Sequence, residues 1–320
     1  MKKRILGIML TDKCNANCAM CGLSCSPQGQ CVIDKEVLLK TIDDAAKVRD
    51  DGICEIKQIS FSGGEAFLYP ELLVKGANYA KEKGFVATVA TNGFWGLWPK
   101  EKIDGILSVS HLDSVFFSTD PFHMEYVSLS ALKGAIEACS RSGIYCSVSI
   151  GEAKGEYSSE KFIRNLGDLK YYVDVKLYPF YRVGRAVNLP ADVFYPLRPL
   201  PPRCYDDSAM GMRPDGTVCP CCSPAVMDTC LSLGNISEQS LADMLTEGPI
   251  VDLCHVLRDS ESFQKLADIA VEKGQLTDEE KRKLSSCEVC RLMFIDKGYE
   301  LLKKDIADLY DDLLVKKLFA

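Results

Sequence analysis

The chain has 320 residues, of which 47% are hydrophobic, enough for a full core and about two domains. Its formal net charge of −7 argues against a surface that binds nucleic acid or an anionic membrane. No apolar stretch approaches the length of a membrane span. The N-terminus starts with basic residues, but its apolar run is too short for a signal peptide and no small-residue cleavage site follows. We therefore expect a cytoplasmic protein with no nucleic-acid or membrane partner.

The first half of the chain alternates predicted strands and helices. Strand-like apolar runs lie at 5–10, 56–61, 85–90, 115–118, 144–150 and 173–178. Helical patterns fill most of the gaps between them, at 34–49, 70–83, 130–142 and 159–169, with a weaker pattern at 99–108. Repeated β-α units predict a parallel sheet with right-handed crossovers. Six units suit a partial (β/α)6 barrel of the TIM type, open on one side, although the pattern also allows a doubly wound sheet.

A cluster of prolines at 190–203 indicates a boundary or a rigid linker. We expect the partial barrel at 1–195 and a second, cysteine-rich domain at 196–320. The second domain contains helical sequence at 240–284 and a terminal helix at 297–318.

Sixteen cysteines in a cytosolic chain of this size point to metal rather than to disulfides, because several are clustered at short spacings. They form two groups, at 14–31 and 204–230, followed by Cys287 and Cys290. The remaining cysteines stand alone and are interpreted as small buried hydrophobic residues: Cys54, Cys139, Cys146 and Cys254.

The first group contains a CxxxCxxC motif directly after the first predicted strand. Cys14, Cys18 and Cys21 are close enough to hold three corners of a cubane iron–sulfur cluster, and no fourth cysteine follows at a cubane-completing spacing. A cluster with one uncommitted iron can bind a small chelating ligand. A zinc site or a plain redox centre is the alternative use of the same thiols.

The predicted strands end in polar or glycine-rich sequence, which matters because β/α barrels place their chemistry at the C-terminal ends of the strands. The second strand is followed by Gly63, Gly64 and Glu65, and the third ends near Asn92. The fourth ends in 118–120, where Ser118 and Asp120 offer hydrogen bonds to ribose hydroxyls. Adjacent glycines let the backbone approach a ligand closely, and the Glu65 carboxylate suits an ammonium group.

CxxxCxxC followed by Gly-Gly-Glu resembles the radical S-adenosylmethionine (SAM) superfamily. The resemblance implies that Cys14, Cys18 and Cys21 bind a [4Fe-4S] cluster whose open iron takes the amino and carboxylate groups of SAM. It also implies a set of cofactor-binding residues around the adenine, the methionine and the ribose: Met20, Gly63, Gly64, Glu65, Asn92, Ser118 and Asp120. One electron, from an external donor of the flavodoxin or ferredoxin type, would cleave SAM to methionine and a 5′-deoxyadenosyl radical.

The second cysteine group resembles the SPASM or the shorter twitch extension of radical SAM enzymes. The resemblance implies one auxiliary [4Fe-4S] cluster with four cysteine ligands: Cys204, Cys221, Cys287 and Cys290. A zinc ribbon is the rival interpretation. Within the run 219–222, the ligand can instead be Cys219 or Cys222, and Cys25, Cys31 and Cys230 have no assigned role.

Blocks at 60–68, 91–97, 120–123 and 215–225 resemble radical SAM peptide epimerases of the epipeptide type. These enzymes convert L- to D-residues in a ribosomally made precursor peptide. The resemblance implies that Cys222 returns a hydrogen atom to the Cα radical, and that the auxiliary cluster then helps to re-reduce its thiyl. A peptide cross-linking maturase that forms thioether or carbon–carbon links, and a small-molecule dehydrogenase, stay open as alternatives.

Three further polar residues are candidates for catalytic roles beside Cys222. Asp120 and His123 flank the expected mouth of the barrel, where His123 can orient substrate or move a proton, or simply make a structural hydrogen bond. Asp207 follows Cys204 closely and can contact the substrate or lie solvated on a loop. Arg182 and Arg185 follow the sixth strand and suit a carboxylate of the peptide or of SAM, or an ion pair outside the site.

Overall fold

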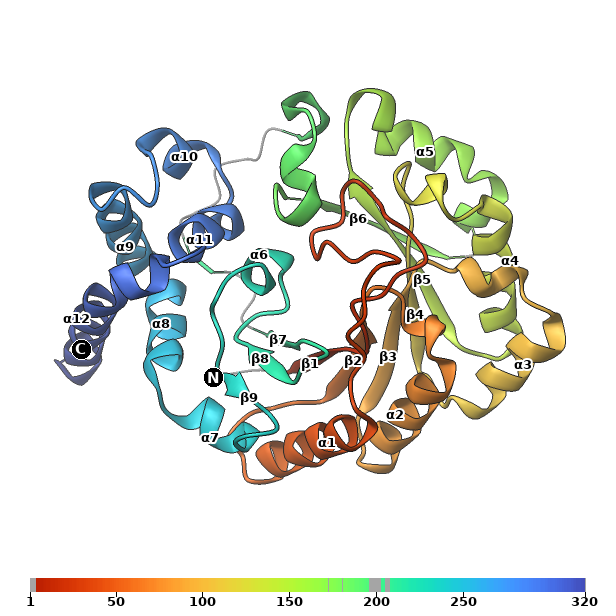
Figure 1. The fold of residues 1–320 in the computed structure, drawn as a ribbon, viewed down its shortest axis with the longest axis horizontal. Helices are drawn as coiled ribbons and strands as arrows, with labels where there is room; N and C mark the ends of the chain where they lie inside the picture. The colour runs from red at the N-terminus through yellow and green to blue at the C-terminus, as the bar shows by residue number, and fades with distance from the viewer. Residues whose placement is uncertain (1–3, 172, 180, 196–202, 205–207, 320) are drawn as a thin grey trace.

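The computed structural model describes residues 4–171, 173–179, 181–195, 203–204 and 208–319. Its centre is a nine-stranded sheet in the order β6-β5-β4-β3-β2-β1-β7-β8-β9, curled into a partial barrel (Figure 1). The first six strands are parallel to their neighbours and confirm all six predicted strands: β1 (Ile5–Met9), β2 (Gln58–Ser62), β3 (Val86–Thr91), β4 (Ser114–Ser118), β5 (Tyr145–Glu152) and β6 (Asp174–Pro179). The partial barrel is therefore the architecture, and a doubly wound sheet is excluded.

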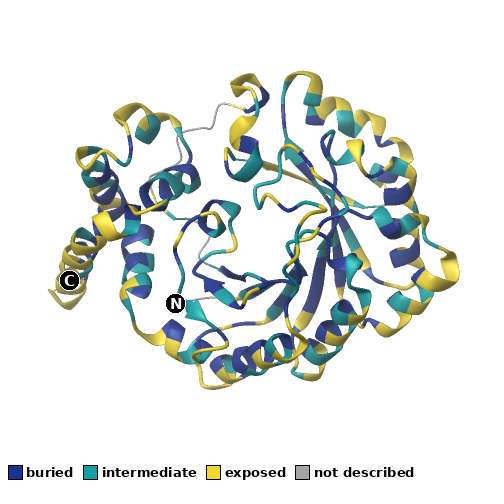
Figure 2. Ribbon diagram, viewed as in Figure 1, coloured by how far each residue is buried: buried dark blue, intermediate teal, exposed yellow. Residues whose placement is uncertain are grey.

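Helices cover the outer face of these strands (Figure 1): α1 (Lys35–Asp50), α2 (Pro70–Glu82), α3 (Lys100–Val109), α4 (Leu129–Arg141) and α5 (Ser159–Asn165). Their ends follow from local chemistry. The Asp34 side chain accepts the N–H groups of Glu36 and Val37 at the start of α1, and Ser128 caps α4 in the same way. The helices bury their inward faces against the sheet and leave their outer faces exposed (Figure 2).

The sheet continues past the predicted domain boundary. β7 (Ala209–Met212) pairs in parallel with β1, and β8 (Thr217–Cys219) and β9 (Gly234–Asn235) follow as antiparallel strands. The sequence did not indicate these three short strands. The boundary between 195 and 196 stays a prediction, and much of the proline-rich segment around it lies outside the described residues.

The C-terminal region is helical and has a hydrophobic core of its own, built around residues such as Leu253, Phe263, Met293 and Phe294. It contains α6 (Pro224–Met227), α7 (Leu241–Thr246), α8 (Pro249–Arg258), α9 (Ser260–Glu272), α10 (Asp278–Lys283), α11 (Ser286–Phe294) and α12 (Gly298–Phe319). The late CxxC thus lies on a helix, α11. None of the helices in the described part of the chain is long and apolar enough to cross a membrane.

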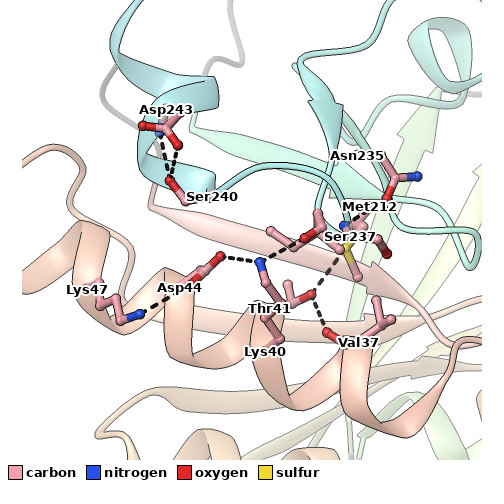
Figure 3. A network of polar contacts seen from close by, with 11 residues as sticks. Val37, Lys40, Thr41, Asp44, Lys47, Met212, Asn235, Ser237, Ser240 and Asp243 are labelled. Atoms are coloured by element: carbon pink, nitrogen blue, oxygen red, sulfur yellow. Dashed lines mark hydrogen bonds and ion pairs between the residues drawn. The ribbon is translucent and has the colours of Figure 1, made fainter.

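Polar contacts connect helix α1 with strand β7 and with the residue that follows β9 (Figure 3). Lys40 of α1 donates to Oδ2 of Asp44 at 2.9 Å and to the carbonyl of Ile236, just beyond β9, at 2.8 Å. The Thr41 hydroxyl lies 3.5 Å from the sulfur of Met212 on β7. Helix α1 therefore contacts both the first half of the barrel and the strands that precede the C-terminal helices.

Candidate active site

The predicted cluster ligands lie on the loop between β1 and α1. Cys14, Cys18 and Cys21 all line one cavity of about 230 Å³ at the C-terminal ends of the strands. Cys14 and Cys18 are buried, with 9% and 6% of their surface exposed. The Sγ of Cys14 accepts a hydrogen bond from the N–H of Ala16 at 3.4 Å. The structure thus brings together the three thiols that the CxxxCxxC spacing selected.

The chemistry of these donors fits an iron–sulfur cluster. Burial raises the pKa of Cys14 to about 11. Burial, together with the charge of Asp120, raises the pKa of Cys18 to about 12. The Cys25 thiol, which donates to Cys21, lowers the pKa of Cys21 to about 5. A buried thiol loses its proton to solvent when a metal cation binds its sulfur, and thiolate is the ligand that iron–sulfur clusters take.

Arg185, just beyond β6, holds this loop in place. Its Nε donates to the carbonyl of Cys18 at 3.0 Å and its Nη2 to the carbonyl of Cys25 at 2.7 Å. Its main-chain N–H donates to the carbonyl of Cys21 at 3.0 Å. The sequence suggested a carboxylate or an ion pair for Arg185. The structure shows three hydrogen bonds to the ligand loop instead, which no motif indicated because the partners lie about 160 residues apart.

Most of the predicted cofactor-binding residues line the same cavity as the three cysteines: Met20, Gly63, Gly64, Asn92 and Ser118. The two glycines are there because the ligand loop crosses them closely. A Cβ on Gly64 would lie 2.2 Å from the carbonyl oxygen of Lys13, and one on Gly63 would lie 2.6 Å from that of Thr11. Any larger residue would displace the loop that carries Cys14.

Glu65 is buried beneath the cavity rather than among its lining residues. Its Oε1 accepts from the N–H of Phe67 at 3.0 Å and from the hydroxyl of Thr91 at 2.7 Å, and its Oε2 accepts from the N–H of Asn92 at 2.8 Å. Burial raises its pKa. A carboxylate has about four acceptor positions and three are used here, so its contact with an ammonium group stays a prediction.

Asp120 and His123 form a pair at the end of β4. Asp120 is buried, and its Oδ1 accepts the N–H groups of Phe122 and His123 at 3.0 Å each. Nδ1 of His123 lies 2.9 Å from the same oxygen, at ion-pair distance but outside hydrogen-bond geometry. Burial lowers the pKa of His123, but its interaction with Asp120 and the charges of Cys21 and Glu65 together outweigh burial and leave that pKa raised. His123 lines the cavity, whereas Asp120 caps the turn beneath it.

A second cavity, of about 420 Å³, lies in the C-terminal region and brings together the four predicted auxiliary ligands: Cys204, Cys221, Cys287 and Cys290. Cys221 is on the loop between β8 and α6, and α11 carries Cys287 and Cys290. The main-chain N–H of Cys204 donates to the carbonyl of Leu257 on α8 at 2.7 Å. Within the described ranges, no three His, Cys, Asp or Glu side chains converge closely enough to bind a single metal ion. The four thiols instead surround a larger space.

Cys254 is a fifth thiol at this cavity. It lies on α8 with Leu253, Leu257 and Arg258, which line the same wall at helical spacing. It is only half-buried, so its interpretation as a packed core residue is incomplete. The sequence could have shown this only through the helical spacing of α8, because no CxxC motif includes it.

Cys222 lines the same cavity and also lies over the inner face of the barrel. Gly7 of β1 and Gly211 of β7 are register partners in the sheet. A Cβ on Gly211 would lie 3.2 Å from Cα of Cys222, and one on Gly7 would lie 3.9 Å from its Cβ. The register continues this row of small residues across five strands: Gly211, Gly7, Ser60, Thr88 and Ser114.

The remaining cysteines differ in burial and in whether they line one of the two cavities. Cys219 is buried in the C-terminal core, where burial raises its pKa to about 11, and it is not among the lining residues of the auxiliary cavity. Cys25 is buried and lines the first cavity beside Cys21. Cys54 and Cys139 are buried, in line with the expectation from the sequence. Asp207 lies outside the described residues, so its catalytic role stays a prediction.

Comparisons with known proteins agree with this geometry. The SPASM family, described as an iron-sulfur cluster-binding domain, matches residues 204–291. The chain is 27% identical over 303 residues to the "Putative peptide biosynthesis protein YydG" of Bacillus subtilis (strain 168). The alignment covers 92% of this chain and 93% of the relative.

Solved structures share the fold at low sequence identity. "Native anSMEcpe with bound AdoMet" superposes with a TM-score of 0.54 at 15% identity, over 96% of this chain and 99% of that one. Streptococcus suis SuiB bound to the precursor peptide SuiA gives a TM-score of 0.53 at 14% identity, over 78% of this chain and 66% of that one. The fold, the three-cysteine loop at the mouth of the barrel and the SPASM match at 204–291 are those of a radical SAM enzyme of the SPASM type, which uses SAM and two [4Fe-4S] clusters.

Proposed function

We propose that this protein is a radical SAM peptide epimerase, which converts L- to D-residues in a ribosomally made precursor peptide. The observation that carries the proposal is the position of Cys222. Its backbone lies against Gly211 on the inner face of the barrel, and Cys222 and its neighbour Cys221 both line the auxiliary cavity. A thiol in this place is held near the substrate side of the barrel on a short tether.

The chemistry of inversion needs such a thiol. When bound, SAM and its cluster supply a 5′-deoxyadenosyl radical that takes one hydrogen atom from a Cα–H bond. The S–H bond of Cys222 then breaks, and its hydrogen atom forms a new C–H bond on the opposite face of that Cα. The sulfur is left one electron and one proton short. We propose that an external donor of the flavodoxin or ferredoxin type supplies the electron and that solvent supplies the proton.

The chain's own residues prepare the site for this step. Arg185 fixes the ligand loop through the carbonyls of Cys18 and Cys25. The row of small residues across the sheet keeps large side chains away from the positions next to Cys222. His123 lies on the wall of the first cavity, where it can orient substrate.

The comparisons support a peptide as the substrate class. The Bacillus subtilis relative has the printed name of a peptide biosynthesis protein, and SuiB was solved with its precursor peptide. Neither name specifies the reaction, so the proposal of inversion depends on Cys222.

The test is reaction of the reduced, cluster-loaded enzyme with SAM in deuterated water, using a synthetic precursor peptide encoded next to its gene. Epimerisation predicts one deuterium at each modified Cα and an otherwise unchanged peptide mass, because the Cys222 thiol exchanges with solvent. Chiral amino-acid analysis should then find D-residues at the labelled positions. A loss of two hydrogens would mean cross-linking or oxidation and would overturn the proposal.

A further inference from the structure

A five-residue segment, 181–185, connects the two cluster sites directly. At one end, Tyr181 lines the auxiliary cavity and hydrogen-bonds to Cys287, and burial and the nearby charges of Cys287 and Glu288 raise its pKa to about 12. At the other end, Arg185 holds the three carbonyls of the first ligand loop. We call residues 181–185 the strut.

The strut is fixed to α11 by a hydrogen bond within the late CxxC motif. The main-chain N–H of Arg182 donates to Oε1 of Glu288 at 3.2 Å. Glu288 lies between Cys287 and Cys290, is 4% exposed, and uses its Oε2 to accept from the N–H and the hydroxyl of Ser285 in a capping box. One carboxylate therefore caps the ligand-bearing helix and anchors the strut.

The strut packs on the first ligand loop without spare room. Gly184 has a φ of +55°, and a Cβ there would lie 2.3 Å from the carbonyl oxygen of Gly22 and 2.7 Å from that of Cys21. Val183 and Pro224 close on Gly22 from other directions, because a Cβ on Gly22 would lie 3.0 Å from Cγ2 of Val183 and 2.8 Å from Cβ of Pro224. A shift of the strut must therefore move the loop that carries Cys18 and Cys21.

We infer that the strut couples the two sites, with Arg185 as a positioning residue: when α11 is ordered, Glu288 holds Arg182, and Arg185 then holds the loop that binds the SAM-ligating cluster. The coupling acts through direct contacts between neighbouring residues. It is reciprocal, because if order at the auxiliary site stabilises the first site, order at the first site must stabilise the auxiliary site. An auxiliary site that has lost its cluster would loosen the strut and weaken the first site.

The experiment measures the first site alone. Only the cluster with the open iron responds to SAM, so the SAM-induced change in the electron paramagnetic resonance spectrum of the reduced enzyme reports that site. Release of its iron to a chelator is the second reading. Glu288→Ala should speed this release about fivefold, the factor that one hydrogen bond of ordinary strength is worth, and should reduce the fraction of clusters that respond to SAM.

Matched variants separate coupling from simple fraying of α11. Ser285→Ala removes the other half of the capping box but leaves the bond to Arg182, and Glu288→Gln keeps one acceptor, its amide oxygen, for the N–H of Arg182 while its NH2 group replaces the acceptor that faces Ser285. Both should behave like the wild type at the first site. Arg185→Ala should reproduce the effect of Glu288→Ala, and the double variant should be no worse than Arg185→Ala alone.

Two results would overturn the inference: an unchanged first site in Glu288→Ala, or equal effects of Glu288→Ala and Ser285→Ala. If Glu288→Ala does not fold, Arg182→Pro removes the amide donor while leaving the cap of α11 in place, and the same two readings apply. Because these readings involve no peptide, a negative result would leave the epimerase proposal untouched.

Discussion

The Cβ of Cys222 lies 3.9 Å from the position that a Cβ on Gly7 would occupy, although the two residues are more than two hundred positions apart in the chain. The contact arises because β7 pairs in parallel with β1, which brings the loop after β8 over the first strand. Cys222 therefore reaches the inner face of a barrel whose first eight strands precede it, and the sheet register holds it there.

The glycine row beneath Cys222 gives a paired prediction. A Cβ on Gly211 would lie 3.2 Å from both Cα of Cys222 and the sulfur of Met227, so Gly211→Ala must push the Cys222 loop away by a few tenths of an ångström. Since small displacements are costly in atom transfer, the ratio of inverted residues to 5′-deoxyadenosine should fall about tenfold. Gly7→Ala is the control, because its nearest neighbour would lie 3.5 Å away, an ordinary contact. Equal ratios in the two variants would show that the position of Cys222 is not critical.

Iron content tests the two-cluster assignment. Two [4Fe-4S] clusters predict about eight iron atoms per reconstituted chain, and Cys287→Ala should reduce this to about four, as measured by elemental analysis. Cys139→Ala changes a cysteine that is fully buried on α4 and should keep about eight. Zinc in place of the auxiliary iron would favour the zinc-ribbon interpretation instead.

The hydrogen-bond network under the first cavity predicts a stability difference. The Thr91 hydroxyl donates to Glu65 at 2.7 Å and accepts from the indole N–H of Trp95 at 3.1 Å, all in buried surroundings. Thr91→Val removes one of the hydrogen bonds to the buried Glu65 carboxylate, leaves the indole N–H of Trp95 without this acceptor, and should lower the free energy of unfolding by about 2–4 kcal/mol in urea titrations. Thr88→Val, which loses one bond from the side chain of Gln58, should cost less than about 1.5 kcal/mol. An equal loss in the free energy of unfolding for both variants would show that the network around Thr91 does not contribute more than a single hydrogen bond.

His255 gives a prediction for pH dependence. Burial, followed by the charge of Arg258, lowers the pKa of His255 below its ordinary value of 6.5, and the ring stacks on Tyr310 of α12. As the pH falls, the unfolded chain protonates His255 before the folded chain does. The contribution of neutral His255 to the free energy of unfolding is therefore complete above the pKa of the unfolded chain and is lost as the pH falls below it. Urea unfolding should show lower stability at about pH 5.5 than at about pH 7.5, and the difference should shrink in His255→Gln. A difference that persists unchanged in the variant would assign the effect to other groups.

The barrel could be predicted from the sequence because each of its first six strands is a local apolar run. All six strands and the helices between them lie close to their predicted positions. The three cysteines of the first motif are also close in the sequence, since they lie within eight residues. By contrast, β7–β9 are short strands that depend on pairing, β7 with β1, β8 with β7 and β9 with β8, and nothing in their own sequences indicates a partner.

The roles that the sequence did not indicate have the same physical cause. Arg185, Cys254 and Glu288 are ordinary residues in their local sequences, and they acquire a place in the sites through partners far away in the chain. Asp120 illustrates the converse. Its type and position suggested contact with ribose, and the structure shows its Oδ1 holding the turn that follows β4.

The most direct test of the account is the reaction of Cys222→Ala with SAM and the precursor peptide in deuterated water. Cys219→Ala serves as the control, because Cys219 is buried in the C-terminal core. The account predicts that Cys222→Ala still forms 5′-deoxyadenosine but leaves every residue of the peptide in the L-form, while Cys219→Ala inverts and incorporates deuterium. D-residues formed by Cys222→Ala at the wild-type rate would contradict it.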